Sequence, residues 1–134
     1  MTLAFSEHLN GKPTHFVEKI LKSEKIHTIR QDMYNRWKAD NLIHFVINNR
    51  TPERFQFAPI IKCKSVQSIK IRYIYDARTD AFTIPYVSID EKILSNEEVK
   101  KLALNDGFES VKDFFKYFKY DFKGKLIHWT DFKY

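Results

Sequence analysis

The sequence feature that most constrains the fold is a run near the middle of the chain in which apolar and basic residues alternate. Ile69, Ile71 and Tyr73 alternate there with Lys70 and Arg72. Because successive side chains of a β-strand point to opposite faces, this pattern predicts a strand with one buried face and one exposed basic face. The sequence leaves two interpretations of the basic face open: a solvated sheet surface, or a surface that contacts phosphate groups.

Three other segments have apolar residues at helical spacing. The first helix is expected over residues 14–23. Ser95 and Glu98 have the spacing of a capping box, so a second helix should begin after Ser95 and end before Gly107, a residue suited to a left-handed stop. Ser110 can cap a third helix, whose apolar face is expected to lie on a sheet. That face consists of Val111, Phe114, Phe115, Phe118 and Phe122.

Short strands account for most of the remaining chain. The segment 42–47 is almost entirely apolar, which predicts a central strand buried on both faces. Pro85 interrupts another strand, over 82–89, and should confine it to an edge or a bulge. The other expected strands cover residues 3–5, 24–30, 55–57 and 125–133. Because no repeat or linker is present, residues 1–134 are predicted to form a single α+β domain, a small barrel-like sheet of about six strands with about three packed helices.

Charge, cysteine and histidine content limit the classes of function. The chain has 23 Lys and Arg against 17 Asp and Glu, a net charge of +6 that suggests an anionic partner. Cys63 is the only cysteine, so no intrachain disulfide can form, and the histidines lack metal-site spacing; no metal or cofactor is predicted. Glu7 and His8 interrupt any signal-peptide core, and no run approaches the roughly 18 apolar residues of a membrane span. A cytoplasmic protein without a membrane partner is therefore expected.

Functional groups are densest between Lys25 and Arg30. Thr28 and Arg30 lie two positions apart and share one face of a strand, whereas Lys25 points away unless it lies in the preceding turn or beside a bulge. One interpretation makes these side chains the floor of a small-molecule or nucleotide pocket. The other is an ordinary half-buried strand in which Thr28 favours β structure and Arg30 is solvated.

If the three groups share a pocket, their chemistry is complementary. A lysine amine in a dry pocket loses proton affinity, so Lys25 could act as a base toward the Thr28 hydroxyl. Asp106, just past the end of a predicted helix, is the best-placed carboxylate to orient or shuttle protons. The planar guanidinium of Arg30 could hold a carbonyl, phosphate or carboxylate group.

Other basic and aromatic residues are candidates for binding a ligand or nucleic acid. Arg36 and Lys38 flank Trp37, so Trp37 is expected to be exposed and to offer a stacking surface, and all three are candidate ligand contacts. Trp129, inside an apolar strand, is expected in the core. The candidate nucleic-acid surface combines the alternating strand with a lysine stripe on the third helix: Lys70, Arg72, Lys112, Lys116 and Lys119. Lys123 continues the stripe if the helix reaches that far.

The order of these motifs resembles that of ASCH domains in the PUA-like superfamily. In those domains a helix is followed by Lys-x-x-Thr-x-Arg and by a small-Asp turn into a strand. The matching segments here are the helix at Phe16–Ile20, the motif at Lys25–Arg30, the turn at Trp37–Asp40, the run Asn105–Phe108 with the Phe-rich helix after it, and the closing strand at Lys125–Trp129. The resemblance implies a small β-barrel with helices, a cleft lined by the motif, and a role tied to RNA or modified nucleotides.

The resemblance also implies an enzymatic alternative. Similar bacterial domains act as acetylcytidine amidohydrolases that use the Lys and Thr of this motif with a downstream Glu. By resemblance, Lys25 would be the base and Thr28 the nucleophile. Asp106 lies near the position of that Glu, with a side chain one methylene shorter.

Three hypotheses for the function follow. The first is a PUA-like module that binds RNA or a nucleotide through the Lys-x-x-Thr-x-Arg cleft. The second is an amidohydrolase that acts on an acylated nucleoside such as acetylcytidine. The third is a small interaction protein of mobile-element origin whose lysine stripe binds an acidic protein partner.

Overall fold

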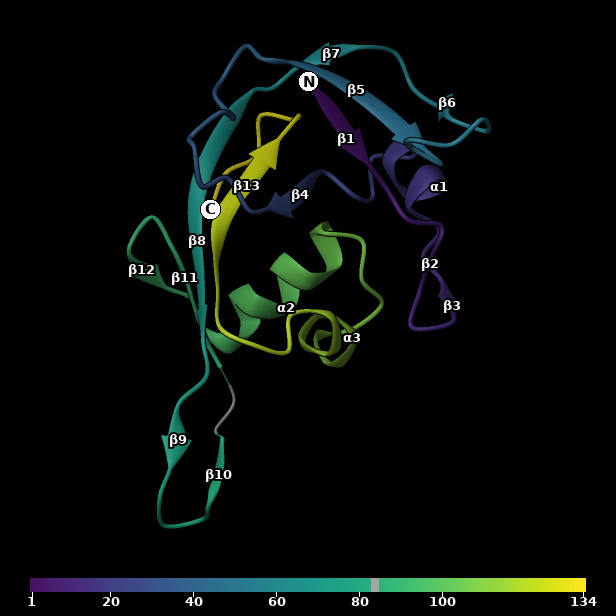
Figure 1. Cartoon of the computed structure of the whole chain (residues 1–134). Coiled ribbons are helices and arrows are strands. Elements are labelled where there is room, and N and C mark those ends of the chain that lie inside the picture. The colour runs from purple at the N-terminus through teal and green to yellow at the C-terminus, as the bar shows by residue number, and fades with distance from the viewer. Residues whose placement is uncertain (83–84) are drawn as a thin grey trace.

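The alternating segment forms β8 (Ser65–Arg72), the longest strand of the described residues and the centre of the main sheet (Figure 1). The structure is a computed structural model that describes residues 1–82 and 85–134. The main sheet is antiparallel, with the order β12-β11-β8-β13-β4. Its other strands are β4 (His27–Arg30), β11 (Tyr86–Ile89), β12 (Lys92–Ile93) and β13 (Phe122–His128). Ile69 and Ile71 are buried and Arg72 is exposed, as the alternation predicted.

A second sheet is built around β5 (Leu42–Ile47), whose bounds match the predicted strand. β1 (Thr2–Ala4) pairs with β5 in parallel, and β6 (Phe55–Gln56) and β7 (Ile61–Lys62) pair with it in the antiparallel direction. The prediction that β5 is buried on both faces is wrong at its start. Ile43 and Phe45 pack into a core. On the opposite face, Leu42 is exposed and His44 is half-buried.

Two small hairpins extend from these sheets. β2 (His8–Leu9) and β3 (Lys12–Pro13) are joined at Asn10 and Gly11, which both have positive φ, as a tight hairpin turn requires. β9 (Tyr75–Asp76) and β10 (Ala81–Phe82) form a hairpin that projects away from the body (Figure 1). The strand predicted over 82–89 is observed as the end of β10 and as β11, and its residues 83–84 lie outside the described residues.

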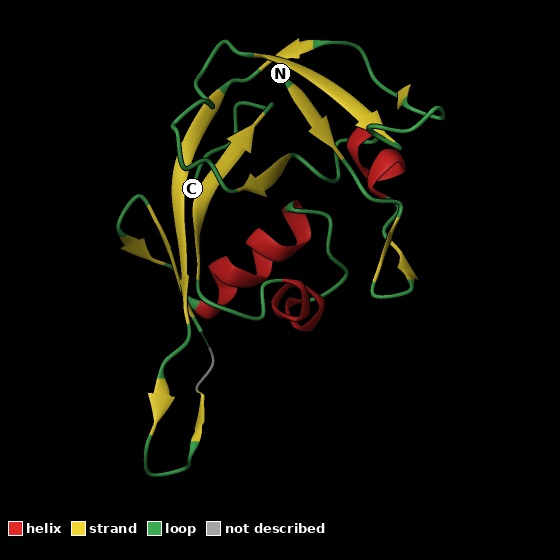
Figure 2. Ribbon diagram, in the orientation of Figure 1, coloured by secondary structure: helices red, strands yellow, loops and turns green. Residues whose placement is uncertain are grey.

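The three helices of the described residues lie in two parts of the fold. α2 (Asn96–Asn105) and α3 (Val111–Tyr117) lie together beside the main sheet, and α1 (Phe16–Leu21) lies next to β1 and β5 (Figure 2). Ser95 and Glu98 form the predicted capping box at the start of α2, and the Ser110 side chain caps α3. Within the described ranges no helix has the length and apolar character needed to cross a membrane.

α3 is shorter than predicted. The stripe of phenylalanines suggested a helix reaching Phe122, but the helix ends at Tyr117. The Phe118 carbonyl accepts a hydrogen bond from the Tyr73 hydroxyl, so this carbonyl is satisfied by a side chain and no further turn is needed. The chain then returns into β13. Phe114 and Phe118 are in the core as predicted, and Phe122 packs against that core from β13.

β13 lies between two apolar cores. Leu126 belongs to a core between the main sheet, α2 and α3, which also contains Ile69 and Phe114. Ile127 and Trp129 face an aromatic core around Phe45. The burial of Trp129 agrees with the sequence prediction. The sheets of the described residues do not close into a barrel, so the observed architecture is α+β without the expected closure.

Candidate functional site

The candidate site forms where the turn before β4 meets the end of α2. The backbone N–H of Lys25 donates to the Lys19 carbonyl, and that of Ile26 donates to the Asn105 carbonyl. These two bonds hold Lys25 in the turn and dock it on the last residue of α2. Asp106 is the C-cap of that helix, so the turn and the helix end place the lysine beside the carboxylate.

Lys25 and Asp106 form a buried ion pair. The Lys25 Nζ atom donates to the Asp106 backbone carbonyl at 2.5 Å and to its Oδ1 atom at 3.1 Å. Lys25 is 2% exposed and Asp106 3% exposed, so neither charge is shielded by bulk water. The expected strand over 24–30 is observed only from His27, so Lys25 lies in the preceding turn, one of the two arrangements that allow it to share a site with Thr28 and Arg30.

Burial controls the protonation of Lys25. Desolvation lowers the pKa of Lys25 from its ordinary 10.5 to about 8, although the Asp106 charge and its hydrogen bond favour the protonated form. The ammonium also lies 4.7 Å from the centroid of the Phe16 ring, which interacts favourably with a cation. Lys25 is therefore mainly protonated near pH 7 and titrates within reach of physiological pH.

Asp106 also holds a histidine that the sequence did not single out. The Asp106 Oδ1 atom lies 3.2 Å from His27 Nδ1, and His27 Nε2 lies 2.7 Å from the Tyr134 hydroxyl. Burial lowers the pKa of His27, so its ring is neutral near pH 7. Because a carboxylate only accepts hydrogen bonds, His27 donates from Nδ1 and accepts at Nε2 from Tyr134. Asn105 in turn donates to the Tyr134 oxygen at 3.1 Å.

Thr28 and Arg30 share a face of β4, as predicted from their spacing. The Arg30 Nε atom donates to the Thr28 hydroxyl oxygen at 3.4 Å. Its Nη2 atom donates to the Ala4 carbonyl at 2.7 Å, and the guanidinium lies 5.1 Å from the centroid of the Phe5 ring. Main-chain and aromatic contacts from β1 and the residue after it therefore hold Arg30, whose side chain is half-buried.

Lys25, Thr28, Arg30 and Asp106 line one cavity of about 70 Å³. A single water needs roughly 10–15 Å³ by this measure, so the enclosed part accommodates several waters or one small polar substituent. The rest of the cavity wall comes from the N-terminal segment, α1, β4 and the α2–α3 region: Ala4, Phe5, Ser6, Leu9, Phe16, Ile29, Phe108, Tyr117 and Phe118. Lys25 and Thr28 are both buried beside this cavity, an arrangement compatible with the interpretation of the motif as a pocket floor.

The cavity residues retain unused hydrogen-bonding capacity. A lysine has three N–H donors, and only two acceptors contact Lys25 Nζ among the described residues. The Thr28 hydroxyl accepts from Arg30, and within the same residues its own O–H has no acceptor. The Asp106 Oδ2 atom likewise receives no hydrogen bond there. No hydrogen bond joins Lys25 to Thr28 in this part of the chain. The cavity thus offers N–H and O–H donors together with one carboxylate acceptor.

The other predicted ligand contacts lie elsewhere. Arg36, Trp37 and Lys38 do not line the Lys25 cavity. The prediction that Trp37 is exposed is wrong: it is 8% exposed and packs in the aromatic core. The physical reason is Asp32, whose carboxylate accepts the backbone N–H groups of Arg36 and Trp37 at 2.8 and 2.9 Å. This turn directs the indole inward and leaves Arg36 and Lys38 on the surface.

The basic residues predicted to form one nucleic-acid surface lie on separate elements, on β8 and on or just after α3. Lys70 and Arg72 lie on the outer face of β8, where Lys70 Nζ is 3.2 Å from Glu91 and Arg72 is 3.8 Å from Asp121. Lys112 and Lys116 are exposed on α3. The stripe predicted along one helix is wrong beyond Lys116, because Lys119 follows the end of α3 and Lys123 lies in β13.

His27, Asn105 and Tyr134 complete a polar network that the sequence reasoning missed. His27 lies inside the recognised motif, but its role needed knowledge of the pairing between β4 and β13. Tyr134 is anchored by Gln67, which accepts its backbone N–H at 3.0 Å and donates to its carbonyl at 2.8 Å. Contacts between residues so far apart in sequence leave no local pattern.

Comparison of the chain with family models, with curated proteins and with solved structures finds no match.

Proposed function

We propose that the protein is an ASCH-like member of the PUA-like superfamily that binds RNA or a nucleotide through the cavity of the Lys-x-x-Thr-x-Arg motif. The observation that carries this proposal is the convergence of Lys25, Thr28, Arg30 and Asp106 on one small cavity. The net charge of +6 favours an anionic partner.

The unused hydrogen-bonding groups suit the edge of a nucleobase. A cytosine edge presents two acceptors, the O2 carbonyl and the ring N3, followed by the 4-amino group, and a uracil edge presents an N3–H group between two carbonyl oxygens. The carbonyl matches the donors of Lys25, Thr28 and Arg30, and the N–H or amino group matches the free Asp106 oxygen. The small enclosed volume fits such an edge and leaves the sugar outside. Specific recognition of an unpaired base by its edge is the usual mode for single-stranded RNA.

Nucleoside binding tests this function directly. Isothermal titration calorimetry with cytidine and acetylcytidine should show binding that Arg30→Gln weakens about tenfold or more, because a charged hydrogen bond is worth roughly 1.5–3 kcal/mol. Arg36→Gln is the matched control, since Arg36 belongs to the same polar run but lies outside the cavity. Binding of single-stranded RNA should also weaken as salt rises from about 50 to about 200 mM. Equal losses in the two variants, or absence of both nucleoside and RNA binding, would overturn the proposal.

A second candidate function is amide hydrolysis of an acylated nucleoside, favoured by the pKa of Lys25 near 8 and the position of Thr28 in the same cavity. The neutral Lys25 amine would take the Thr28 hydroxyl proton while the threonine oxygen attacks the acyl carbon. The amine of the base would leave with a proton from Lys25, and water would then hydrolyse the threonine ester. This route requires a rotation that brings Lys25 from Asp106 toward Thr28, because no hydrogen bond links them in the described residues.

The pH dependence separates the two functions. Below about pH 8 Lys25 carries the ammonium that donates to a ligand oxygen, and above it the amine is neutral. Binding to a nucleoside should therefore weaken as pH rises through about 8, measured by calorimetry between about pH 6.5 and about pH 9.5. Turnover of acetylcytidine should instead rise over this range, because the base must be neutral, and should vanish in Thr28→Ala. Binding that does not change with pH would exclude a ligand contact to the Lys25 amine.

A further inference from the structure

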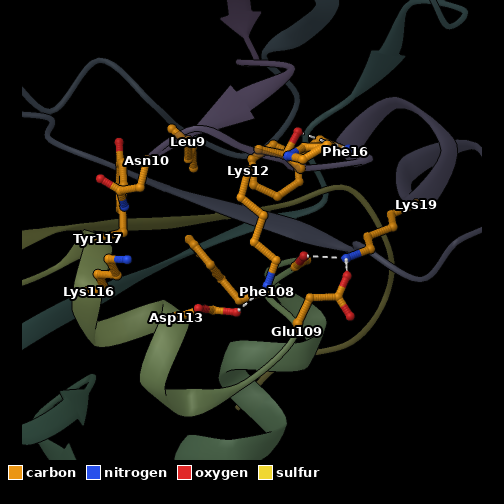
Figure 3. A pocket seen from close by; sticks show the side chains of 13 residues that line it. Leu9, Asn10, Lys12, Phe16, Lys19, Phe108, Glu109, Asp113, Lys116 and Tyr117 are labelled. Atoms are coloured by element: carbon orange, nitrogen blue, oxygen red, sulfur yellow. Dashed lines mark hydrogen bonds and ion pairs between the residues drawn. The ribbon is translucent and has the colours of Figure 1, made fainter.

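A second hollow adjoins the Lys25 cavity. It also has a volume of about 70 Å³ and lies between the β2–β3 hairpin, α1 and α3 (Figure 3). Leu9, Phe16, Phe108 and Tyr117 line both hollows and form the wall between them. A ligand with two small polar ends could therefore occupy both, with its central part against these side chains.

Lysines dominate the charge of the second hollow. Lys12 Nζ is 3.1 Å from Asp113, and Lys19 Nζ is 2.8 Å from Glu109 and from the Gly107 carbonyl (Figure 3). Lys116 also lines the hollow, and among the described residues it forms no ion pair. Three cations and two carboxylates give the hollow a net charge of +1, with one cation available for a ligand.

The wall between the hollows is aromatic. The Phe16 and Phe108 rings meet edge to face with centroids 6.1 Å apart, and Phe108 and Tyr117 are tilted with centroids 5.9 Å apart. Figure 3 shows Phe108 beside the Lys12–Asp113 pair. Such a wall suits the apolar faces of a sugar or base, with polar groups on both sides.

We propose that the second hollow holds the phosphate group of a nucleotide whose base edge occupies the Lys25 cavity. This inference rests on the proposed function and specifies its substrate class: a phosphorylated nucleoside rather than a free nucleoside. Lys116 supplies an uncompensated cation, and Lys12 exchanges its exposed Asp113 partner for the phosphate. A free nucleoside would leave these cations without a ligand.

Calorimetry at low ionic strength tests the phosphate site with cytidine and with its 5′- and 3′-monophosphates. At least one monophosphate should bind about threefold to tenfold more tightly than cytidine, because exposed ion pairs add only modestly to affinity. Lys116→Gln should remove most of this gain and leave cytidine binding unchanged. Lys112→Gln is the matched control, because Lys112 is exposed on the same helix but does not line the hollow.

Asp113→Asn gives a prediction of opposite sign. This variant frees Lys12 and removes a negative charge beside the phosphate, so monophosphate binding should strengthen about threefold while cytidine binding stays the same. A general loss of folding could not produce this gain. Unchanged or weaker monophosphate binding in Asp113→Asn would overturn the placement of the phosphate.

The outcomes also separate this inference from the proposed function. If cytidine binds and phosphate adds nothing, the phosphate site is wrong and nucleoside binding stands. If neither cytidine nor its monophosphates nor RNA binds, the proposed function fails and the phosphate site with it. A cytidine trinucleotide distinguishes the source of the phosphate: tighter binding than the monophosphates indicates an RNA backbone, and equal binding indicates a free nucleotide. Both results support the phosphate site, provided that Lys116→Gln weakens binding of the trinucleotide and of the monophosphates.

Discussion

Lys25→Met should destabilise the protein by about 3–5 kcal/mol, the largest loss expected for a single side chain of the site. The variant keeps the length of the side chain but leaves the Asp106 carboxylate buried without the lysine charge. In the native protein burial lowers the pKa of His27 and keeps its ring neutral near pH 7, so Lys25 is the cation that balances the Asp106 carboxylate. Urea denaturation followed by circular dichroism measures the change in the free energy of unfolding.

Two further variants show whether the loss comes from the unpaired carboxylate. Lys19→Met is the matched control: Lys19 contacts the same loop through Gly107 and Glu109, but Glu109 is 57% exposed, so the loss should stay within about 1 kcal/mol. The double variant Lys25→Met with Asp106→Asn removes both charges and should regain about half of the lost stability. A loss below about 1 kcal/mol for Lys25→Met would mean that the ion pair is not effectively buried.

Gly107→Ala should cost about 2–5 kcal/mol and should also weaken ligand binding. Gly107 has a φ of +93°, which disfavours any side chain, and an added Cβ would lie 2.9 Å from Lys25 Cδ and 2.9 Å from the Phe16 ring. Either the lysine stem or the ring must move, and both line the cavity. Denaturation and nucleoside calorimetry on the same preparation measure the two effects.

Gly11→Ala separates the backbone cost from the steric cost. Gly11 also has a positive φ, +74°, but an added Cβ would have no atom within 4 Å. Its loss should be limited to the left-handed penalty of about 1–2 kcal/mol, with nucleoside binding unchanged. Equal losses for Gly11→Ala and Gly107→Ala would show that the packing of Gly107 against Lys25 contributes nothing.

The elements that could be predicted from sequence are those governed by neighbouring residues. The capping box at Ser95, the left-handed Gly107 and the alternation around Ile69 each depend on contacts within a few positions, and each is observed. The period of two residues placed Lys25 out of phase with Thr28 and Arg30, so a shared site required either a turn or a bulge; the choice between them was not predictable, and the structure has the turn. Its proximity to Asp106 follows from the docking of the turn on α2.

The features that could not be predicted depend on distant partners. α3 ends early because Tyr73, from another part of the chain, hydrogen-bonds the Phe118 carbonyl. Trp37 is buried because the Asp32 carboxylate binds the backbone of the loop and turns the indole inward. The charged residues on both sides of Trp37 had suggested an exposed side chain instead. The bond between His27 and Tyr134 spans most of the chain, so neither residue is recognisable as part of the site before the fold is known.

The position of β13 between two cores has a consequence for adaptability. Loosening this strand would withdraw Leu126 from one core and Ile127 from the other, so we expect the two cores to unfold together. Induced fit is therefore confined to peripheral segments. The β2–β3 hairpin is the segment suited to this role, because the exposed Lys12–Asp113 pair connects it to α3 and can open at little cost.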